Sequence, residues 1–421
     1  MPVLLRFIVG VFAALCVFAP GGALAQDRTD RPAAIPTPIR DRELPQHTQY
    51  FLPRPYGAHP GNVPEGFFAI PGTDAFVKLG LAANLAFMAS DRLLAPTWFA
   101  TSTIPVERQA HARRREQFAG TANQSEVSLE VRKQSPLGSL RLLFNTSFAQ
   151  AEPALGFHPN FAYAQAGPAL VGFTTSTFTD PDAYPRTLDF AGPNAIAFSR
   201  HGVLRYSFSK GRADRAQYHL HLALEQPSTQ VPSSAGKPRE VAPDGVVALR
   251  AEGKSAHVQL AGIVRGLAVQ GTNDVKPGYG GNLTGNAHLG DDAVQGGITA
   301  GRGIGAYLND LGGGQYDAAV SRGGDLEPLT VLAAYLGLTH HWLRSLSSTA
   351  TYGYLVVDDL DFRESLGSKG FRHSQYGALN LIHQPFAGAL VGIEGLWGQL
   401  RVIDGARAEA FRMQTTFQYR H

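Results

Sequence analysis

Cysteine, charge and long apolar runs are all scarce in this chain of 421 residues. The single cysteine, Cys16, lies near the start, so the rest of the chain cannot form a disulfide framework, a thiolate metal site or a cysteine nucleophile. Charged residues make up 17% of the chain, below the roughly 25% of a typical soluble domain. The formal net charge of +3 argues against a nucleic acid partner. No apolar run approaches the ~20 residues of a transmembrane helix.

The first 66 residues are predicted to lie outside the main domain. Residues 1–25 combine a basic start, an apolar core and Ala23-Leu24-Ala25, which has the small-x-small pattern of a signal peptidase site. We therefore expect a cleaved signal peptide rather than a membrane anchor. Residues 26–66 are rich in proline and charge and cannot bury enough apolar surface to offset their ordering entropy. They are predicted to form a flexible arm.

Residues 67–421 show the alternation of amphipathic strands, and helical periodicity is weak throughout. Between Val77 and Phe87, for example, apolar residues alternate with small or polar ones. The count of such segments gives about sixteen strands, an even number that suits a porin-sized barrel. Strand bounds stay undefined in the glycine-rich region 271–324. The other clear segments are 127–131, 140–148, 218–225, 247–251, 258–265, 332–338, 346–356, 391–397 and 411–419.

The two faces of these strands favour a membrane barrel. The strands approach the roughly ten residues of a tilted membrane-spanning strand, and their polar face mixes isolated charges with small polar residues, as in a water-filled lumen. The alternative, a soluble secreted β-sandwich binding module, would need shorter strands and a richly charged outer face. A short turn at 135–138 and long connections at 89–123 and 226–245 resemble periplasmic turns and external loops. We therefore predict an all-β transmembrane antiparallel β-barrel in a bacterial outer membrane.

The stretch from Leu170 to Phe208 contains the most distinctive connection. Its two ends alternate as strands do, whereas Thr179 to Asn194 carries three prolines, three aspartates and an arginine. No regular strand tolerates such a segment, and no minimal hairpin needs it. Long loops without secondary structure are usually functional. Within a barrel, this loop is expected to fold into the lumen as a constriction loop.

The end of the chain predicts a closing strand. Phe411, Met413, Phe417 and Tyr419 face one way, and polar residues alternate with them up to the terminus. Outer-membrane barrels typically end in such a strand, usually with a terminal Phe that assists assembly, where this chain has His421. The barrel-assembly machinery is therefore an expected partner of this strand.

Three segments resemble the DcaP-like trimeric porins: residues 173–208, 339–354 and 378–398. The resemblance extends over most of residues 67–421 and is most specific in the loop 179–200. It implies a sixteen-stranded barrel that forms a homotrimer in outer-membrane lipid, with a third loop that narrows the channel. It also implies a preference for small anionic organic solutes. Some members carry an N-terminal coiled coil, which the proline-rich arm replaces here.

Charged side chains are the candidate pore-lining residues. Strand parity points the wall arginines inward, because an arginine facing lipid at mid-membrane costs about 2–4 kcal/mol. Rings of charged side chains select ions by charge sign. We expect the loop to confront the wall where the channel is narrowest, with Arg205 closest because it follows the loop directly. Alternatively, these charges only hydrate a wide lumen or pair with each other. The candidates are Arg132, Arg141, Arg205, Arg250 and Arg265 on the wall and Asp180, Asp182, Arg186 and Asp189 on the loop.

Catalytic chemistry has weak support in the sequence. His219, His221 and Glu225 share an inward face, which leaves an outer-membrane hydrolase of the lipase or protease type as an alternative function. His340 and His341 are adjacent on a strand and point to opposite faces, so they cannot chelate one metal together. The favoured prediction is a passive-diffusion porin without catalytic residues, cofactor or metal.

Overall fold

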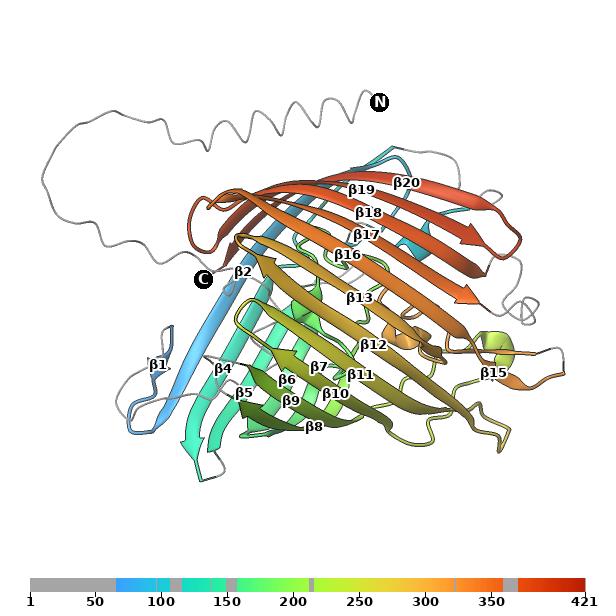
Figure 1. The fold of residues 1–421 in the computed structure, drawn as a ribbon, viewed down its shortest axis with the longest axis horizontal. Helices are drawn as coiled ribbons and strands as arrows, with labels where there is room; N and C mark the ends of the chain where they lie inside the picture. The colour runs from blue at the N-terminus through green and yellow to red at the C-terminus, as the bar shows by residue number, and fades with distance from the viewer. Residues whose placement is uncertain are drawn as a thin grey trace, which may run out of the picture.

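The regular secondary structure of the computed structural model consists almost entirely of strands (Figure 1). The structure describes residues 66–95, 97–106, 116–136, 138–148, 157–211, 216–321, 323–358 and 370–420. The predicted signal peptide, the predicted arm apart from Gly66, and His421 lie outside these ranges. Within the described residues, no helix is long and apolar enough to cross a membrane.

The strands follow one another along the chain, with a few short 3-10 turns in the connections. The strands are β1 Phe68–Ala69, β2 Ala75–Ser90, β3 Gln117–Thr121, β4 Glu126–Ser135, β5 Gly138–Ser147, β6 His158–Ala166, β7 Ala169–Thr175, β8 Arg200–Gly211, β9 Gln217–Glu225, β10 Asp244–Glu252, β11 Ala256–Leu267, β12 Lys276–Leu289, β13 Asp292–Arg302, β14 Ala318–Val320, β15 Leu326–Pro328, β16 Thr330–Leu343, β17 Leu346–Asp358, β18 Phe371–His383, β19 Ala389–Val402 and β20 Arg407–Arg420. The 3-10 turns are η3 Thr101–Thr103, η4 Pro181–Ala183, η5 Ser233–Ala235 and η6 Gly305–Tyr307.

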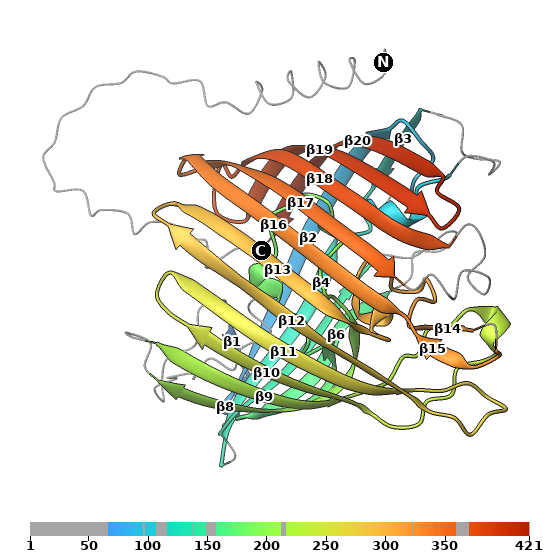
Figure 2. The ribbon, with the colours of Figure 1, turned by 45° about the vertical axis from the view of Figure 1, so that its right-hand side comes forward.

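The strands close into a barrel of sixteen, as the sequence predicted. All but β14 and β15 belong to one sheet of 18 segments. Two of these segments are not separate barrel strands. β1 is a two-residue segment beside β2. β3 continues the line of β4, because β3 and β4 pair with the same edge of β2. The closing strand β20 pairs antiparallel with β2 from Ala82 and Arg420 to Ser90 and Arg412. Figures 1 and 2 show the resulting ring of tilted strands.

Period-two alternation explains which side chains face outward. On β11, Val258, Leu260 and Val264 are each about half exposed, whereas Gln259 and Arg265, at the alternate positions, are buried. The closing strand behaves alike, with Phe411 exposed and Arg412 buried. An apolar exterior around a polar interior is the reverse of a soluble core, and it matches a barrel whose outer face contacts lipid.

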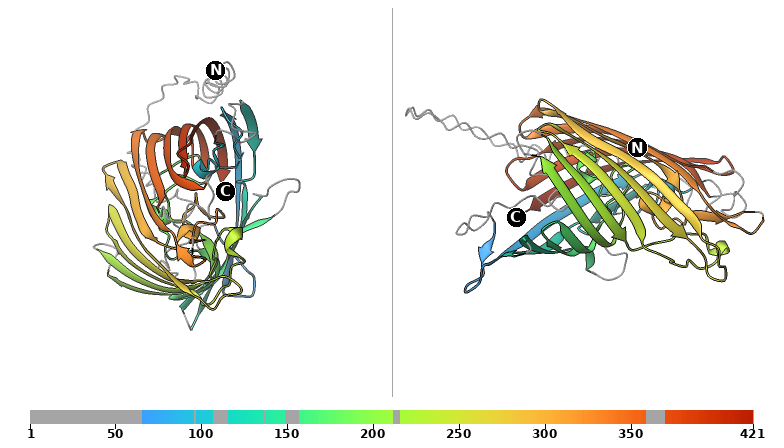
Figure 3. Two further views of the ribbon diagram at one scale, coloured as in Figure 1. Left: turned by 90° about the vertical axis from the view of Figure 1, so that its right-hand side faces the viewer. Right: turned by 60° about the horizontal axis from the view of Figure 1, so that its bottom comes forward.

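Short turns and long loops occupy opposite ends of the barrel. The turns after β6 and β12 span two residues each, at 167–168 and 290–291. At the other end, residues 176–199 leave β7 and return to β8 from inside the barrel, and we call this segment the inward loop. Residues 303–317, which follow β13, also enter the lumen and form the second inward loop. Figure 3 (left) looks into the barrel and shows loop segments inside the ring of strands.

Candidate functional site: the lumen and its inward loops

The inward loop is bound to the wall from its first residues. The carboxylate of Glu225 on β9 accepts hydrogen bonds from the Ser176 hydroxyl and the Thr177 backbone amide, both at 2.6 Å. His201 on β8 lies 2.8 Å from the same carboxylate. Glu225 therefore satisfies a backbone amide that leaves the sheet, which a buried loop requires because an unpaired amide is costly.

The two aspartates at η4 attach the loop to β10, β11 and β12. Arg250 contacts Asp180 at 3.0 Å and Asp182 at 2.7 Å, and all three side chains are almost fully buried. Asp180 also contacts His257 at 2.8 Å and accepts a hydrogen bond from Thr284 at 2.7 Å. These aspartates therefore face the wall rather than the open channel. Their charges are used to hold the loop in place.

The pKa values of these two carboxyls shift in opposite directions. For Asp180, burial alone would raise the pKa, but the hydrogen bond from His257 and the charges of His257 and Arg250 lower it overall. For Asp182, burial raises the pKa and the charge of Arg250 only partly offsets this. The difference follows from geometry, because Asp180 has His257 and Thr284 as additional partners.

The far end of the loop is bound to β18 and β19. Glu394 on β19 accepts hydrogen bonds from the backbone amides of Leu188 at 3.0 Å and Asp189 at 2.7 Å. Asn380 on β18 donates to the Arg186 carbonyl at 2.7 Å. The inward loop therefore follows the inner wall from β9 to β19 before it returns to β8.

Asp189 also connects the inward loop to the loop that follows β2 and contains η3, which we call the first long loop. Its carboxylate accepts hydrogen bonds from the Phe99 amide at 3.0 Å and from the Tyr376 hydroxyl at 3.2 Å. Burial raises the pKa of Asp189 to about 7, although the nearby Arg412 charge opposes the shift. At neutral pH this carboxyl therefore carries less negative charge than an exposed aspartate.

Two wall glycines let the loop approach the strands closely. A Cβ at Gly337 on β16 would collide with Pro185, and one at Gly353 on β17 would collide with Asn194. Asn194 is fixed there by a hydrogen bond to Ser374 at 2.7 Å. The wall is therefore shaped for the loop by the absence of side chains as well as by polar anchors.

A cavity of about 1030 Å³ adjoins the inward loop, and its lining includes Lys254 and Arg344 at the short-turn end and Gln230 and Asn309 at the long-loop end. Its described lining residues include six arginines and lysines and four acids. Arg250, Asp182, Asp189 and Asp310 among these are buried, which leaves five cations and one acid with exposed surface. The acid is Glu252, and the cations are Arg186, Arg200, Lys254, Arg344 and Arg420. Among the described residues the accessible lining is thus clearly cationic.

The predicted site residues separate into two groups. Asp182, Arg186, Asp189 and Arg250 line the cavity. The others lie away from its lining. Arg132 and Arg141 both bind Glu130, at 2.5 and 2.7 Å. Asp180 is fully buried against the wall, and Arg205 is 3% exposed beside Leu170 on β7.

Arg265 serves as a connector between loops at the long-loop end. It contacts Asp244 and Asp317 at 3.0 Å each and donates to the carbonyls of Gly303 and Ser228 at 2.9 Å. The guanidinium has no exposed surface. The charge of Arg265 therefore stabilises the arrangement of the loops.

Four cationic lining residues were not among the sequence candidates. Lys254 and Arg344 belong to short turns, Arg200 is the first residue of β8, and Arg420 is the last of β20. Strand parity selects residues in mid-strand, so it overlooks these ends. In the sequence they appear only as basic residues in a turn or at the end of a strand.

Comparison with known proteins places this geometry in context. No protein-family model and no curated protein matches the sequence. Among solved structures, the outer membrane channel DcaP of Acinetobacter baumannii matches with a TM-score of 0.75 and 18% identity, over 84% of this chain and 99% of that one. The chain has the fold of a DcaP-like porin. The resemblance found in three segments of the sequence is thus confirmed for the fold.

Two further solved structures match this DcaP-like barrel with lower TM-scores. OmpT of Vibrio cholerae matches with a TM-score of 0.51 and 12% identity, over 84% of this chain and all 100% of its own. OmpF of Salmonella typhi matches with a TM-score of 0.50 and 8% identity, over 83% of this chain and 98% of its own. At these identities the likeness concerns the fold alone.

Proposed function

We propose that this DcaP-like barrel is an outer-membrane porin through which small organic anions diffuse passively. The observation that carries this proposal is the cationic lining of the cavity, where Arg186, Arg200, Lys254, Arg344 and Arg420 have exposed surface and Glu252 is the only such acid among the described lining residues. The loop aspartates do not counter this excess, because they are buried against the wall. Side chains of one charge sign in a pore favour ions of the other.

The loop surface at the cavity favours organic over inorganic anions. Tyr184, Leu188, Phe190 and Phe198 of the inward loop line the cavity beside the arginines. Arg200 itself stacks on Phe198, with its guanidinium carbon 4.8 Å from the ring centroid. Apolar groups next to cations suit solutes that carry a carboxylate on a carbon skeleton. We also propose that the mature protein, without residues 1–25, forms a homotrimer in outer-membrane lipid. The barrel-assembly machinery is proposed to recognise its C-terminal strand.

The hydrolase alternative has less support than the porin. Ser207 lies 2.8 Å from His221 and Ser209 lies 2.8 Å from His219, which are the Ser–His contacts a hydrolase would need. The Ser207–His221 pair is buried, and His221 has no exposed surface, whereas Ser209 is exposed. Within the described chain, neither histidine has a hydrogen bond to a carboxylate that would orient it. A substrate therefore has no access to the Ser207–His221 pair, and the Ser209–His219 pair lacks the orienting carboxylate of a catalytic triad.

Ion selectivity in planar lipid bilayers tests the proposal. Purified protein should show single-channel currents, and its reversal potential in a salt gradient should indicate anion preference. Arg186→Glu or Arg200→Glu changes the local charge by two. At about 7 Å in screened water this disfavours an anion about threefold and favours a cation to the same extent, so the anion-to-cation permeability ratio should fall roughly sevenfold. Lys210→Glu is the control, because Lys210 is exposed at the end of β8 and is not part of the cavity lining. Cation preference in the wild type, or no conductance, would contradict the proposal.

A further inference from the structure

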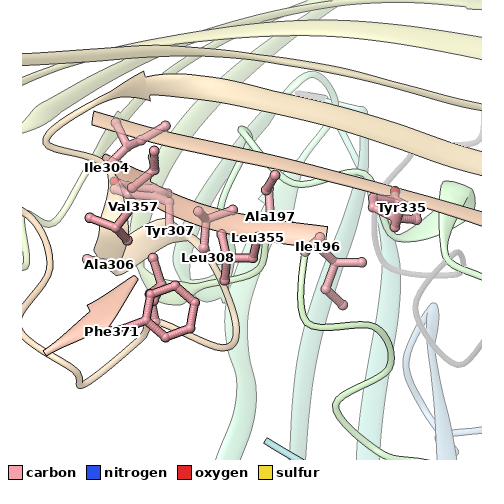
Figure 4. Packing of buried hydrophobic residues seen from close by; sticks show 14 of the residues in the cluster. Ile196, Ala197, Ile304, Ala306, Tyr307, Leu308, Tyr335, Leu355, Val357 and Phe371 are labelled. Atoms are coloured by element: carbon pink, nitrogen blue, oxygen red, sulfur yellow. The ribbon is translucent and has the colours of Figure 1, made fainter. Parts of the chain in front are cut away.

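The second inward loop (residues 303–317) packs inside the barrel and is bonded to its wall, unlike a surface connection. Ile304, Leu308 and Leu311 are completely buried inside the barrel. The loop is fixed to the wall by the Tyr307 hydroxyl, which donates to Asp244 at 2.8 Å, and by Asp317, which contacts Arg265 at 3.0 Å. Figure 4 shows Tyr307 and Leu308 packed near Ile196 and Ala197 of the inward loop.

Backbone hydrogen bonds join the two inward loops. Phe198 donates to the Tyr307 carbonyl at 2.8 Å, and Asn309 donates to the Ile196 carbonyl at 3.1 Å. Ala197 and Leu308 lie opposite each other as an isolated antiparallel bridge. The returning half of the inward loop is therefore paired like a strand with the second inward loop.

The Asn309 side chain adds two hydrogen bonds at the edge of the cavity. Its amide nitrogen donates to the carbonyls of Ala191 and Pro193, both at 3.0 Å. Residues 191–193 line the cavity, and so does Asn309 itself. This part of the inward loop contains Gly192 with a φ of 68°, a tight reversal that benefits from external support.

The next residue connects the second inward loop to the first long loop. The Asp310 carboxylate accepts hydrogen bonds from the Thr101 hydroxyl, from the Ser102 amide at 3.0 Å and from the Ser102 hydroxyl at 3.2 Å. The first long loop in turn binds the inward loop through the Phe99 amide and Asp189. The three loops therefore form a closed set of contacts inside the lumen.

We propose that the second inward loop is part of the constriction, and that Asn309 is a positioning residue that sets the width and charge selectivity of the channel by holding residues 191–193. This inference rests on the proposed porin function. If Asn309 did not act in this way, the inward loop would keep its position through its wall anchors alone. Those anchors bind residues 176–189 and Asn194. Residues 191–193 lie between these anchored positions, and the Asn309 side chain binds them through the carbonyls of Ala191 and Pro193.

The main test is Asn309→Ala in the full mature chain, recorded in planar lipid bilayers. Loss of two hydrogen bonds should shift the equilibrium toward a displaced loop by roughly 30-fold. The expected result is a larger single-channel conductance, more open-channel noise and a lower anion preference, with unchanged heat-modifiable migration on gels. Asn273→Ala is the matched control, because Asn273 is exposed in the connection between β11 and β12. Wild-type conductance and selectivity in Asn309→Ala would overturn the inference.

A disulfide provides a reversible version of the same test. Opposite residues of an antiparallel bridge have Cα atoms about 4.5–5.5 Å apart, which suits a disulfide. The chain after Cys16 has no other cysteine, so Ala197→Cys with Leu308→Cys would form a single defined bond. Added to Asn309→Ala, the oxidised bond should restore wild-type conductance and selectivity, and its reduction should abolish them again. Failure to restore them would overturn the positioning role.

Two further outcomes separate folding and function from the inference. If Asn309→Ala does not fold, the cysteine pair alone should give less open-channel noise when oxidised than when reduced, and equal noise would overturn the inference. If wild-type protein conducts without anion preference, the proposed solute class fails, whereas an increased conductance in Asn309→Ala would still support the positioning role.

Discussion

The clamp between Arg250 and the two loop aspartates yields a quantitative prediction. The side chains of Arg250, Asp180 and Asp182 are 2%, 0% and 6% exposed, so they belong to the buried class of ion pairs rather than the weak surface class. Removing one partner of a buried pair costs about 3–5 kcal/mol because the other charge stays buried without compensation. At about 1.4 kcal/mol per tenfold, Arg250→Leu should therefore raise the population of a loop displaced at η4 by about two to four powers of ten.

Thiol accessibility measures that population directly. Ala183 in η4 has no exposed surface, so Ala183→Cys should react slowly with a membrane-impermeant thiol reagent. When the reagent attacks only the displaced state, its rate follows the opening equilibrium. In the Arg250→Leu background the rate should rise by the same factor, about two to four powers of ten. Arg344→Leu is the control, because Arg344 is an exposed cation of the cavity lining outside the clamp.

Removal of the acids distinguishes an ion-pair clamp from simple packing. If unpaired carboxylates cause the displacement, then Asp180→Asn with Asp182→Asn should recover much of the protection that Arg250→Leu removes, because no buried charge remains uncompensated. Equal reaction rates with and without Arg250→Leu would refute the clamp. A high rate that persists after the acids are replaced would assign the effect to packing.

Two further predictions concern the wall. Gly337→Val should displace the inward loop and raise both conductance and noise, because any Cβ at that position collides with Pro185. An unchanged current would show that the wall moves and the loop keeps its position. Leu260→Arg should reduce the yield of heat-modifiable barrel, because Leu260 is 54% exposed on the outer face and an arginine facing lipid at mid-membrane costs about 2–4 kcal/mol; a normal yield would argue against lipid contact there.

Most of the fold could be predicted because strand alternation is a local property. Segments such as 77–87 and 258–265 reveal their two faces in the order of their residues, and the structure places strands at both. Region 271–324 could not be resolved in this way. It contains β12 and β13, whose glycines at positions such as 280, 281, 296 and 297 leave no side chain to alternate.

The site was less predictable because it depends on contacts between distant segments. The sequence identified the inward loop from its prolines and aspartates and predicted that it confronts the arginine wall, but not which wall residues bind Asp180 and Asp182. Those partners follow from the register that aligns Arg250 and His257 beneath the loop. The second inward loop was missed altogether, because residues 303–317 combine glycines with scattered apolar residues and show no periodicity.

The loop anchors also explain how the proposed anion channel can contain acids on its inner wall. A loop inside the lumen needs acceptors for backbone amides that have left the sheet, and a carboxylate is the strongest such acceptor among side chains. Glu225 and Glu394 bind those amides at the two ends of the wall that the loop follows. Both glutamates are almost fully buried, so a solute in the cavity does not contact them. Inward acids and a cationic cavity lining are therefore compatible, because the acids bind the loop and the exposed arginines are available to contact the solute.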